Sequence, residues 1–209
     1  GLGGRAGAAP DHRVSRVRVG VLASGEGSSL QDLITATRDP MYPARVVVVF
    51  ANHDCRALER AHKAGITRAV FRLASYPDRK ARDVDMAKKL QFHGVELVIC
   101  AGYDAILERS FTRQFAGRVI NIHPSLLPAF GGTMDAVAQA LQSGVSDTGC
   151  TVHVVTDEVD AGPILAQRRV AILPDDTVES LRARIQEEEH TLLPVVVRRL
   201  AGQVLPLPG

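Results

Sequence analysis

An amide and an imidazole lie two residues apart in the segment Asn121-Ile122-His123-Pro124. Residues two apart on a strand project from the same face, and Pro124 has no N–H with which to continue a strand. The pattern predicts a buried strand over residues 118–122 that presents both groups at its carboxyl end, where open α/β sheets bind ligands. An amide donor beside an ionisable imidazole suits stabilisation of an oxyanion in acyl transfer. A histidine at a strand end is also typical of a structural residue, so these residues alone leave both interpretations open.

Four other features suit ligand binding and also have a plain structural interpretation. The Gly-rich segment Ser24–Ser29 would open a helix, where free backbone amides bind phosphate. It lacks a full dinucleotide fingerprint and the lysine of a P-loop, and such segments are as often only turns. Asp160 lies in an acidic turn-forming segment, and His153 lies in the middle of an apolar strand. Gln186 and Glu189 share one helix face, which is also typical of a solvated acidic surface.

The elements that must position these residues follow from the hydrophobic pattern. Apolar runs predict strands over residues 16–22, 45–51, 69–71, 96–101, 118–122, 148–156 and 163–172, the last two as antiparallel neighbours. Amphipathic runs predict helices over residues 28–38, 55–64, 78–93, 106–115, 134–142 and 176–200, with Ser28 and Ser29 as an N-cap for the first. Because strands alternate with helices, we expect an α/β fold, a Rossmann-like open, mostly parallel twisted sheet with helices on both faces.

The composition is that of a globular domain. The chain has 209 residues, 45% of them hydrophobic, with a net charge of +2, 4% aromatic residues and no tryptophan. These values give no basis for binding nucleic acid or an acidic membrane, and no apolar run is long enough to span a bilayer. The three scattered cysteines indicate neither disulfides nor a zinc site, so a reducing cytoplasm is the expected setting. Residues 1–15 lack the apolar stretch of a secretory signal and are expected to be a disordered tail or an expression remnant.

Three segments, in order along the chain, carry a resemblance to a known family. They are Ser24–Gln31 (SGEGSSLQ), Asn121–Pro128 (NIHPSLLP) and Val155–Pro163 (VTDEVDAGP). Together they resemble the folate-dependent formyltransferases over roughly residues 16–200, and most closely those members that formylate glycinamide ribonucleotide in purine biosynthesis. The resemblance implies a single formyltransferase domain over residues 16–209. Its nucleotide-binding half would span about 16–117 and its folate-binding, catalytic half about 118–209, with the active site in the cleft between them.

The resemblance also implies a reaction and the residues that carry it. The amine of the ribonucleotide would attack the formyl carbon of the co-substrate 10-formyltetrahydrofolate, giving a tetrahedral intermediate without help from a metal. Asn121 and a protonated His123 would donate hydrogen bonds to the oxyanion, and Asp160 would favour the charged imidazole and organise a proton-relaying water. The ribonucleotide is assigned to Gly27, Ser28, Ser29, Gln186 and Glu189. The folate is assigned to Arg79, Asp104, Ala105, Ile106, Leu107, Asn121, Thr156, Asp157, Glu158 and Val159, and His153 is placed near the catalytic group.

The chain departs from the family pattern at a few positions, and alternatives stay open. The family usually has Asn at Ser29, Met-Arg at Asp104-Ala105 and a residue other than Gly at Gly131. The alternatives are formyltetrahydrofolate hydrolase, which usually carries an extra N-terminal domain for which we expect no room here, and a non-catalytic folate-binding relative. Methionyl-tRNA and sugar-nucleotide formyltransferases usually carry a further C-terminal domain. The expected partners are small-molecule substrates, with no nucleic acid and no membrane, in a monomer or a homodimer.

Overall fold

The computed structural model describes residues 15–203, so the tail expected over residues 1–15 lies, except for Ser15, outside the described residues. The strands are β1 (Val17–Ala23), β2 (Ala44–Ala51), β3 (Thr67–Val70), β4 (Leu97–Cys100), β5 (Val119–His123), β6 (Asp147–Val154) and β7 (Ile164–Ala171). The helices are α1 (Ser28–Thr37), α2 (Arg56–Lys63), α3 (Arg79–Phe92), α4 (Arg109–Gln114), α5 (Ala136–Ser143) and α6 (Val178–Gly202), with a short 3-10 helix η1 (Leu73–Ser75). Each predicted strand and helix has a counterpart among them.

The strands form one open sheet in the order β3-β2-β1-β4-β5-β6-β7. The first five strands in this order are parallel, and β6 runs antiparallel to both β5 and β7. The predicted mostly parallel sheet and the antiparallel pairing of the last two strands are therefore confirmed. The chain moves outward from β1 through β2 to β3 and then returns to β4 on the other side of β1. This reversal opens a crevice at the carboxyl ends of β1 and β4.

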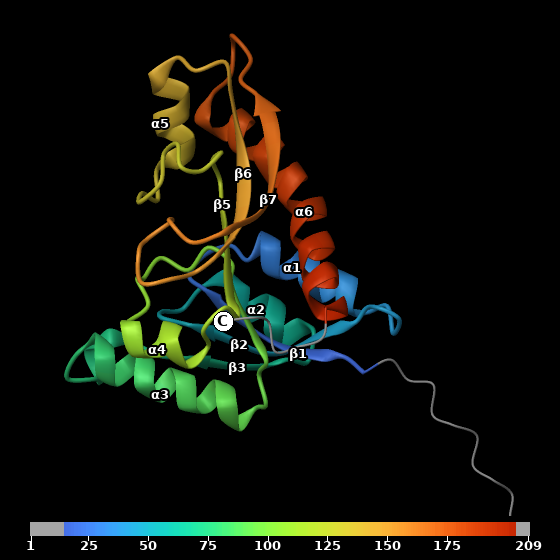
Figure 1. Cartoon of the computed structure of the whole chain (residues 1–209), viewed down its shortest axis with the longest axis vertical. Coiled ribbons are helices and arrows are strands. Elements are labelled where there is room, and N and C mark those ends of the chain that lie inside the picture. Colours follow the sequence, from blue (N-terminus) through green and yellow to red (C-terminus); the bar gives the residue numbers. More distant parts are fainter. Residues whose placement is uncertain (1–14, 204–209) are drawn as a thin grey trace, which may run out of the picture.

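Two helical layers cover the sheet (Figure 1). α1, α2 and α6 pack on one face, through buried residues such as Leu33, Leu58 and Leu193. α3 and α4 pack on the other face, through residues such as Met86 and Phe111. Because the central strands are buried toward both layers, their sequences are continuous apolar runs. Among the helices of residues 15–203, none has the length and apolar character needed to cross a membrane.

Two differences from the sequence prediction at helix starts have a clear structural cause, the first of them the cap of α1. Ser28 and Ser29 do not cap α1; Gly27 occupies the N-cap with a φ of 75°, and no side chain caps the helix. A Cβ at Gly27 would lie 2.8 Å from Cα of Ala57, so this left-handed position next to α2 requires glycine.

The other difference concerns the helix predicted over residues 106–115. It begins only at Arg109, because the buried Asp83 carboxylate accepts the N–H of Glu108 at 2.7 Å, and Glu108 then caps α4 by accepting the N–H of Ser110. Residues 106–108 consequently remain in a loop.

Candidate active site

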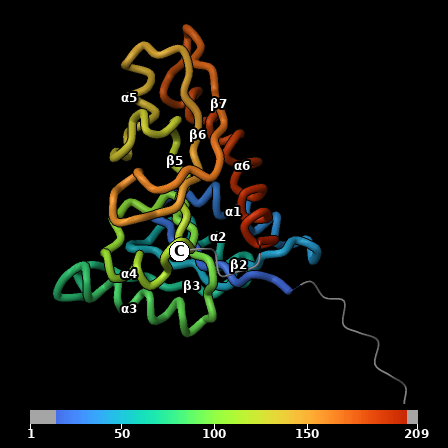
Figure 2. The backbone as a smooth tube through the Cα atoms, viewed as in Figure 1, coloured from blue at the N-terminus to red at the C-terminus, as the bar shows by residue number. Residues whose placement is uncertain are grey.

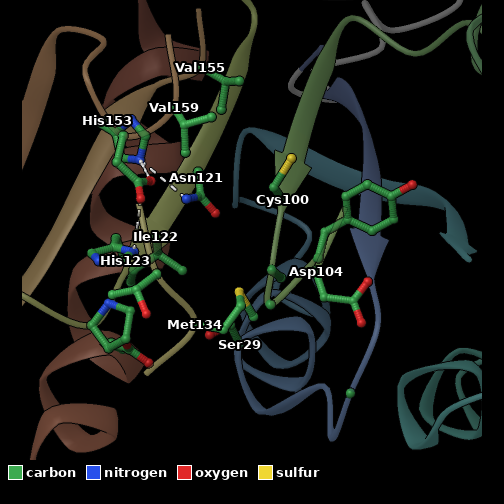
Figure 3. A pocket seen from close by; sticks show the side chains of 18 of the residues that line it. Ser29, Cys100, Asp104, Asn121, Ile122, His123, Met134, His153, Val155 and Val159 are labelled. Carbon is green, nitrogen blue, oxygen red and sulfur yellow. Dashed lines mark hydrogen bonds and ion pairs between the residues drawn. The ribbon is translucent and has the colours of Figure 1, made fainter. Parts of the chain in front are cut away.

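A cavity of about 470 Å³ opens at the carboxyl ends of the central strands. Its walls come from the loops that follow β1, β4, β5 and β6 and from one face of α6. In Figure 3, Asn121, His123 and His153 lie on one wall, and Cys100 and Asp104 lie across the cavity from them. The structure brings most of the predicted site residues together here: Gly27, Ser28, Ser29, Asp104, Ala105, Ile106, Leu107, Asn121, His123, Thr156, Glu158, Val159, Asp160, Gln186 and Glu189.

Two of the predicted site residues do not line the cavity. Arg79 is the exposed first residue of α3. The carboxylate of Asp157 turns toward α4, where it accepts a hydrogen bond from Thr112 Oγ1 at 2.9 Å and pairs with Arg109 Nε at 3.2 Å. These contacts hold the β6–β7 connection against α4. Figure 2 shows that this connection extends away from the end of the sheet. Asp157 therefore shapes the loop that carries Asp160.

The strand pairing assembles the polar cluster. Asn121 on β5 is directly opposite His153 on β6, and Asn121 Nδ2 lies 3.2 Å from His153 Nε2. Asp160 reaches both imidazoles from its loop: Oδ1 lies 3.5 Å from His153 Nε2, and Oδ2 lies 3.7 Å from His123 Nδ1. The N–H of Gly132 also donates to Asp160 Oδ2, at 2.6 Å. Since His123 and His153 are both buried, these charges and dipoles interact with little screening by solvent.

His123 is held through both of its ring nitrogens. Nε2 lies 2.8 Å from the carbonyl oxygen of Phe130, which can only accept, so Nε2 carries a hydrogen. Nδ1 faces the carboxylate of Asp160. Phe130 and Asp160 have φ values of 54° and 52°, the left-handed region that non-glycine residues rarely adopt. Both partners of the imidazole therefore belong to residues with a strained backbone conformation, a feature that clusters at functional sites.

The loop after β5 is fixed by a buried threonine. Thr151 Oγ1 donates to the carbonyl of Ser125 at 2.7 Å and accepts the N–H of Leu127 at 3.1 Å. Gln167 Nε2 donates both to Thr151 Oγ1 and to the carbonyl of Leu127, each at 3.0 Å. This network holds the segment that delivers the Phe130 carbonyl to His123. Sequence reasoning missed Phe130, Thr151 and Gln167, because Phe130 acts through its backbone and the other two are polar residues of β6 and β7 that belong to no recognised motif.

Asp160 and Glu189, two of the acidic side chains in the cavity, have pKa values displaced in opposite directions. His153 contributes most to lowering the pKa of Asp160, burial opposes this, and the Gly132 amide and His123 add to the lowering, so Asp160 is ionised at neutral pH. Burial raises the pKa of Glu189 to about 7. Glu189 is 8% exposed and lines the cavity. Of these two carboxyl groups, that of Asp160 is held in its charged form and that of Glu189 titrates near neutrality.

The loop after β4 is anchored at the far wall. Asp104 Oδ1 accepts a hydrogen bond from Asn52 Nδ2 at 2.6 Å, and its Oδ2 lies 3.2 Å from His53 Nε2. The N–H of Asp104 donates to Ser24 Oγ at 2.9 Å. Burial opposes ionisation of Asp104, but these hydrogen bonds outweigh it and lower its pKa. Asp104 consequently ties the loop of residues 101–108 to the end of β1.

The start of α1 presents unpaired backbone donors to the cavity. Residues 25–29 all line it, and we call them the phosphate loop. Within residues 15–203, the N–H groups of Glu26, Gly27 and Ser28 have no backbone or side-chain acceptor. Such a set of free amides at a helix N-terminus favours an anion, above all a phosphate. In the same described part of the chain, no group of three or more His, Cys, Asp or Glu side chains is arranged to hold a metal ion.

Comparison with known proteins finds relatives in both sequence and fold. Residues 17–197 match the formyl transferase family. The chain is 46% identical over 192 residues to phosphoribosylglycinamide formyltransferase of Mycobacterium tuberculosis, covering 92% of this chain and 88% of the relative. It is 42% identical over 193 residues to the bovine trifunctional purine biosynthetic protein adenosine-3, of whose length it spans only 19%. Glycinamide ribonucleotide transformylase 1 from Symbiobacterium toebii has the same fold, with a TM-score of 0.90 at 43% identity, over 98% of this chain and 97% of that one.

Proposed function

The chain belongs to the formyl transferase family, and we propose that it transfers the formyl group of 10-formyltetrahydrofolate to the amine of 5-phosphoribosylglycinamide in purine biosynthesis. The observation that carries the proposal is that one cavity contains both the Asn121–His123–Asp160 cluster and the open amides of the phosphate loop. An acyl-transfer centre and a phosphate site in one cavity suit a phosphorylated amine as the acceptor. The names of its monofunctional relatives support the same substrate.

Asn121 is the residue proposed to stabilise the oxyanion. Its side-chain amide has two N–H groups, and Nδ2 lies 3.2 Å from His153 Nε2, a contact that fixes the plane of the amide. An N–H of Nδ2 can then donate to the formyl oxygen as the attacking amine converts the carbonyl to an oxyanion. A single donor of this kind typically contributes about 3–4 kcal/mol to stabilising the transition state.

His123 is the proposed acid. In the protonated imidazole, Nε2–H stays on the Phe130 carbonyl, and the second hydrogen is on Nδ1, which lies 3.7 Å from Asp160 Oδ2. Nδ1–H can donate a charge-assisted hydrogen bond to the oxyanion. The amine then loses its proton, a proton reaches N10 of the folate, and the bond from the formyl carbon to N10 breaks. Asp160 stabilises the imidazolium and orients the water that relays these protons.

The substrates are proposed to lie along two walls. The ribonucleotide phosphate would bind the phosphate loop, and its ribose and glycinamide would face Gln186 and Glu189 on α6. The folate would lie against residues 104–107 and 156–160. Ile106 and Val159 are 54% and 50% exposed within this cavity, and so provide an apolar surface for the flat rings of the folate. A contact of Arg79 with the folate, and the division into halves at about residue 117, stay predictions.

Small molecules are the proposed partners, without nucleic acid, membrane or metal, in a monomer or homodimer of the cytoplasm. The free thiols of Cys55, Cys100 and Cys150 are compatible with a reducing compartment.

A coupled assay tests the proposed function. Purified protein is mixed with 10-formyltetrahydrofolate, with and without the ribonucleotide, and the folate absorbance is followed. We expect loss of the formyl group only when the ribonucleotide is present. Loss without it would indicate the hydrolase instead. Folate binding with no loss in either mixture would indicate a non-catalytic relative.

A further inference from the structure

We infer that Arg60 on α2 is a positioning residue for the phosphate loop: its guanidinium fixes the Glu26–Gly27 peptide in the orientation that binds a phosphate. Arg60 Nε donates to the carbonyl oxygen of Glu26 at 2.7 Å. Arg60 does not line the cavity, so it acts through the loop and not on the ligand. That the phosphate belongs to the ribonucleotide rests on the proposed function.

Because the peptide bond is planar, the hydrogen bond from Arg60 to the Glu26 carbonyl also sets the direction of the Gly27 N–H. A trans peptide is planar, and its C=O and N–H point in opposite directions. Because Arg60 holds the Glu26 carbonyl on the α2 side, the N–H of Gly27 must point away from α2. The preceding peptide is held in the same way, since the N–H of Ala57 donates to the carbonyl of Gly25 at 3.0 Å. Two successive amides, those of Glu26 and Gly27, are thereby turned away from α2 and left free for a ligand.

Packing against α2 leaves the phosphate loop little freedom to adopt a different conformation. At the left-handed Gly27, a Cβ would lie 2.8 and 2.9 Å from Cα and Cβ of Ala57, and 3.2 Å from Cδ of Arg60. The aliphatic part of Arg60 therefore forms part of the surface on which Gly27 rests, while its Nε holds the adjoining carbonyl. The phosphate loop thus packs closely against the first two turns of α2.

Arg56 provides a matched control, because it carries the same charge one turn earlier on the same helix. Its guanidinium lies 3.7 Å from the Glu26 carboxylate, in a pair whose side chains are 60% and 77% exposed. It makes no hydrogen bond to the backbone of the loop within residues 15–203. Loss of Arg56 removes the same positive charge near the phosphate loop without releasing the peptide.

The test compares Arg60→Met, Arg60→Lys and Arg56→Met with the wild type in steady-state kinetics. We expect Arg60→Met to raise KM for the ribonucleotide about tenfold or more, with kcat and KM for the folate changed less than about twofold. Arg60→Lys keeps the charge but places no donor at the position of Nε. Its KM for the ribonucleotide should therefore lie nearer to that of Arg60→Met than to that of the wild type. Arg56→Met should stay within about twofold of the wild type. Melting temperatures confirm that each variant is folded.

Two results would overturn the inference. One is an unchanged KM for the ribonucleotide in Arg60→Met. The other is an equal rise of KM in Arg56→Met, or full rescue by lysine, because positive charge alone would then account for the effect. Calorimetric titration with inorganic phosphate separates this inference from the proposed function. Weaker phosphate binding by Arg60→Met would support the role of Arg60 even if the wild type showed no transfer, and equal binding would refute it.

Discussion

The proposed chemistry of His123 depends on two neighbours, of which the family resemblance identifies Asp160 and no motif identifies Phe130. The Phe130 carbonyl assigns the hydrogen to Nε2, and Asp160 faces Nδ1, so a specific nitrogen of the ring is available for proton transfer. The Asn-x-His pattern predicts that both side chains share a strand end, because alternation on a strand is a local property. The other partner of the imidazole is the backbone carbonyl of Phe130, a residue in the left-handed conformation. Its position depends on the path of the whole loop and so cannot be read from a local pattern.

Replacing His123 by alanine should remove the acid while leaving both substrates in place. We expect turnover to fall on the order of 10²–10⁴-fold, as is typical for loss of a general acid, with folate binding changed little. The measurement is the coupled assay, together with a folate titration by fluorescence. His62→Ala, which removes an exposed histidine on α2, is the control. Turnover of His123→Ala within tenfold of the wild type would contradict the assignment.

Asp160→Asn should change the pH dependence of the reaction. The lowered pKa of Asp160 means that its carboxylate is charged above its usual value of 3.8 and loses its charge only as the pH falls below that value. At neutral pH it therefore stabilises the protonated imidazole of His123. Without the charge, kcat should fall and the alkaline limb of its pH profile should move to lower pH. An alkaline limb at the wild-type position in the pH profile of Asp160→Asn would contradict this role.

Glu189→Gln should alter the pH dependence of stability. Burial raises the pKa of Glu189 from its usual 4.5 to about 7. The contribution of Glu189 to the free energy of unfolding is therefore fully favourable below pH 4.5 and is lost as the pH rises through about 7. The free energy of unfolding of the wild type should thus fall across this window, relative to Glu189→Gln, by at most about 3 kcal/mol. Urea titrations at several pH values measure it, with exposed Glu187→Gln as control. Parallel curves for wild type and Glu189→Gln would exclude the effect.

At the scale of the elements, the strands are the most predictable part. Their apolar runs reflect burial on both faces, which a sequence displays directly. The helix starts of α1 and α4 are less predictable because remote residues decide them. Asp83 holds the N–H of Glu108 and keeps residues 106–108 in the loop that lines the cavity. Ala57 leaves no space for a Cβ at Gly27, and so the cap of α1 is a glycine instead of a serine.

Gly162→Ala should test how the β6–β7 connection positions Asp160. A Cβ at Gly162 would lie 1.7 Å from the carbonyl oxygen of Val154, so the backbone must shift at the base of the loop. We expect activity to fall at least about tenfold and the melting temperature to decrease. Gly202→Ala is the control, since a Cβ there meets nothing within 4 Å. Activity within twofold of the wild type in Gly162→Ala would show that Asp160 does not depend on this close approach.

At the scale of the whole molecule, the order of the strands creates the site. The reversal between β1 and β4 opens the crevice, and the antiparallel β6 returns His153 to the side of Asn121. α6, from the end of the chain, packs against α1 and brings Glu189 to the same cavity as the phosphate loop. The predicted ribonucleotide residues therefore come from both ends of the sequence. A pattern local to one segment cannot show this proximity, whereas the resemblance to a family can imply it.

The fate of the formyl carbon tests the central claim most directly. The protein is incubated with 10-formyltetrahydrofolate labelled with ¹³C at the formyl carbon and with 5-phosphoribosylglycinamide, and the products are analysed by mass spectrometry. The proposed transfer predicts that the label appears in the ribonucleotide, one formyl group per folate consumed. Label recovered as free formate, or remaining on the folate, would contradict it.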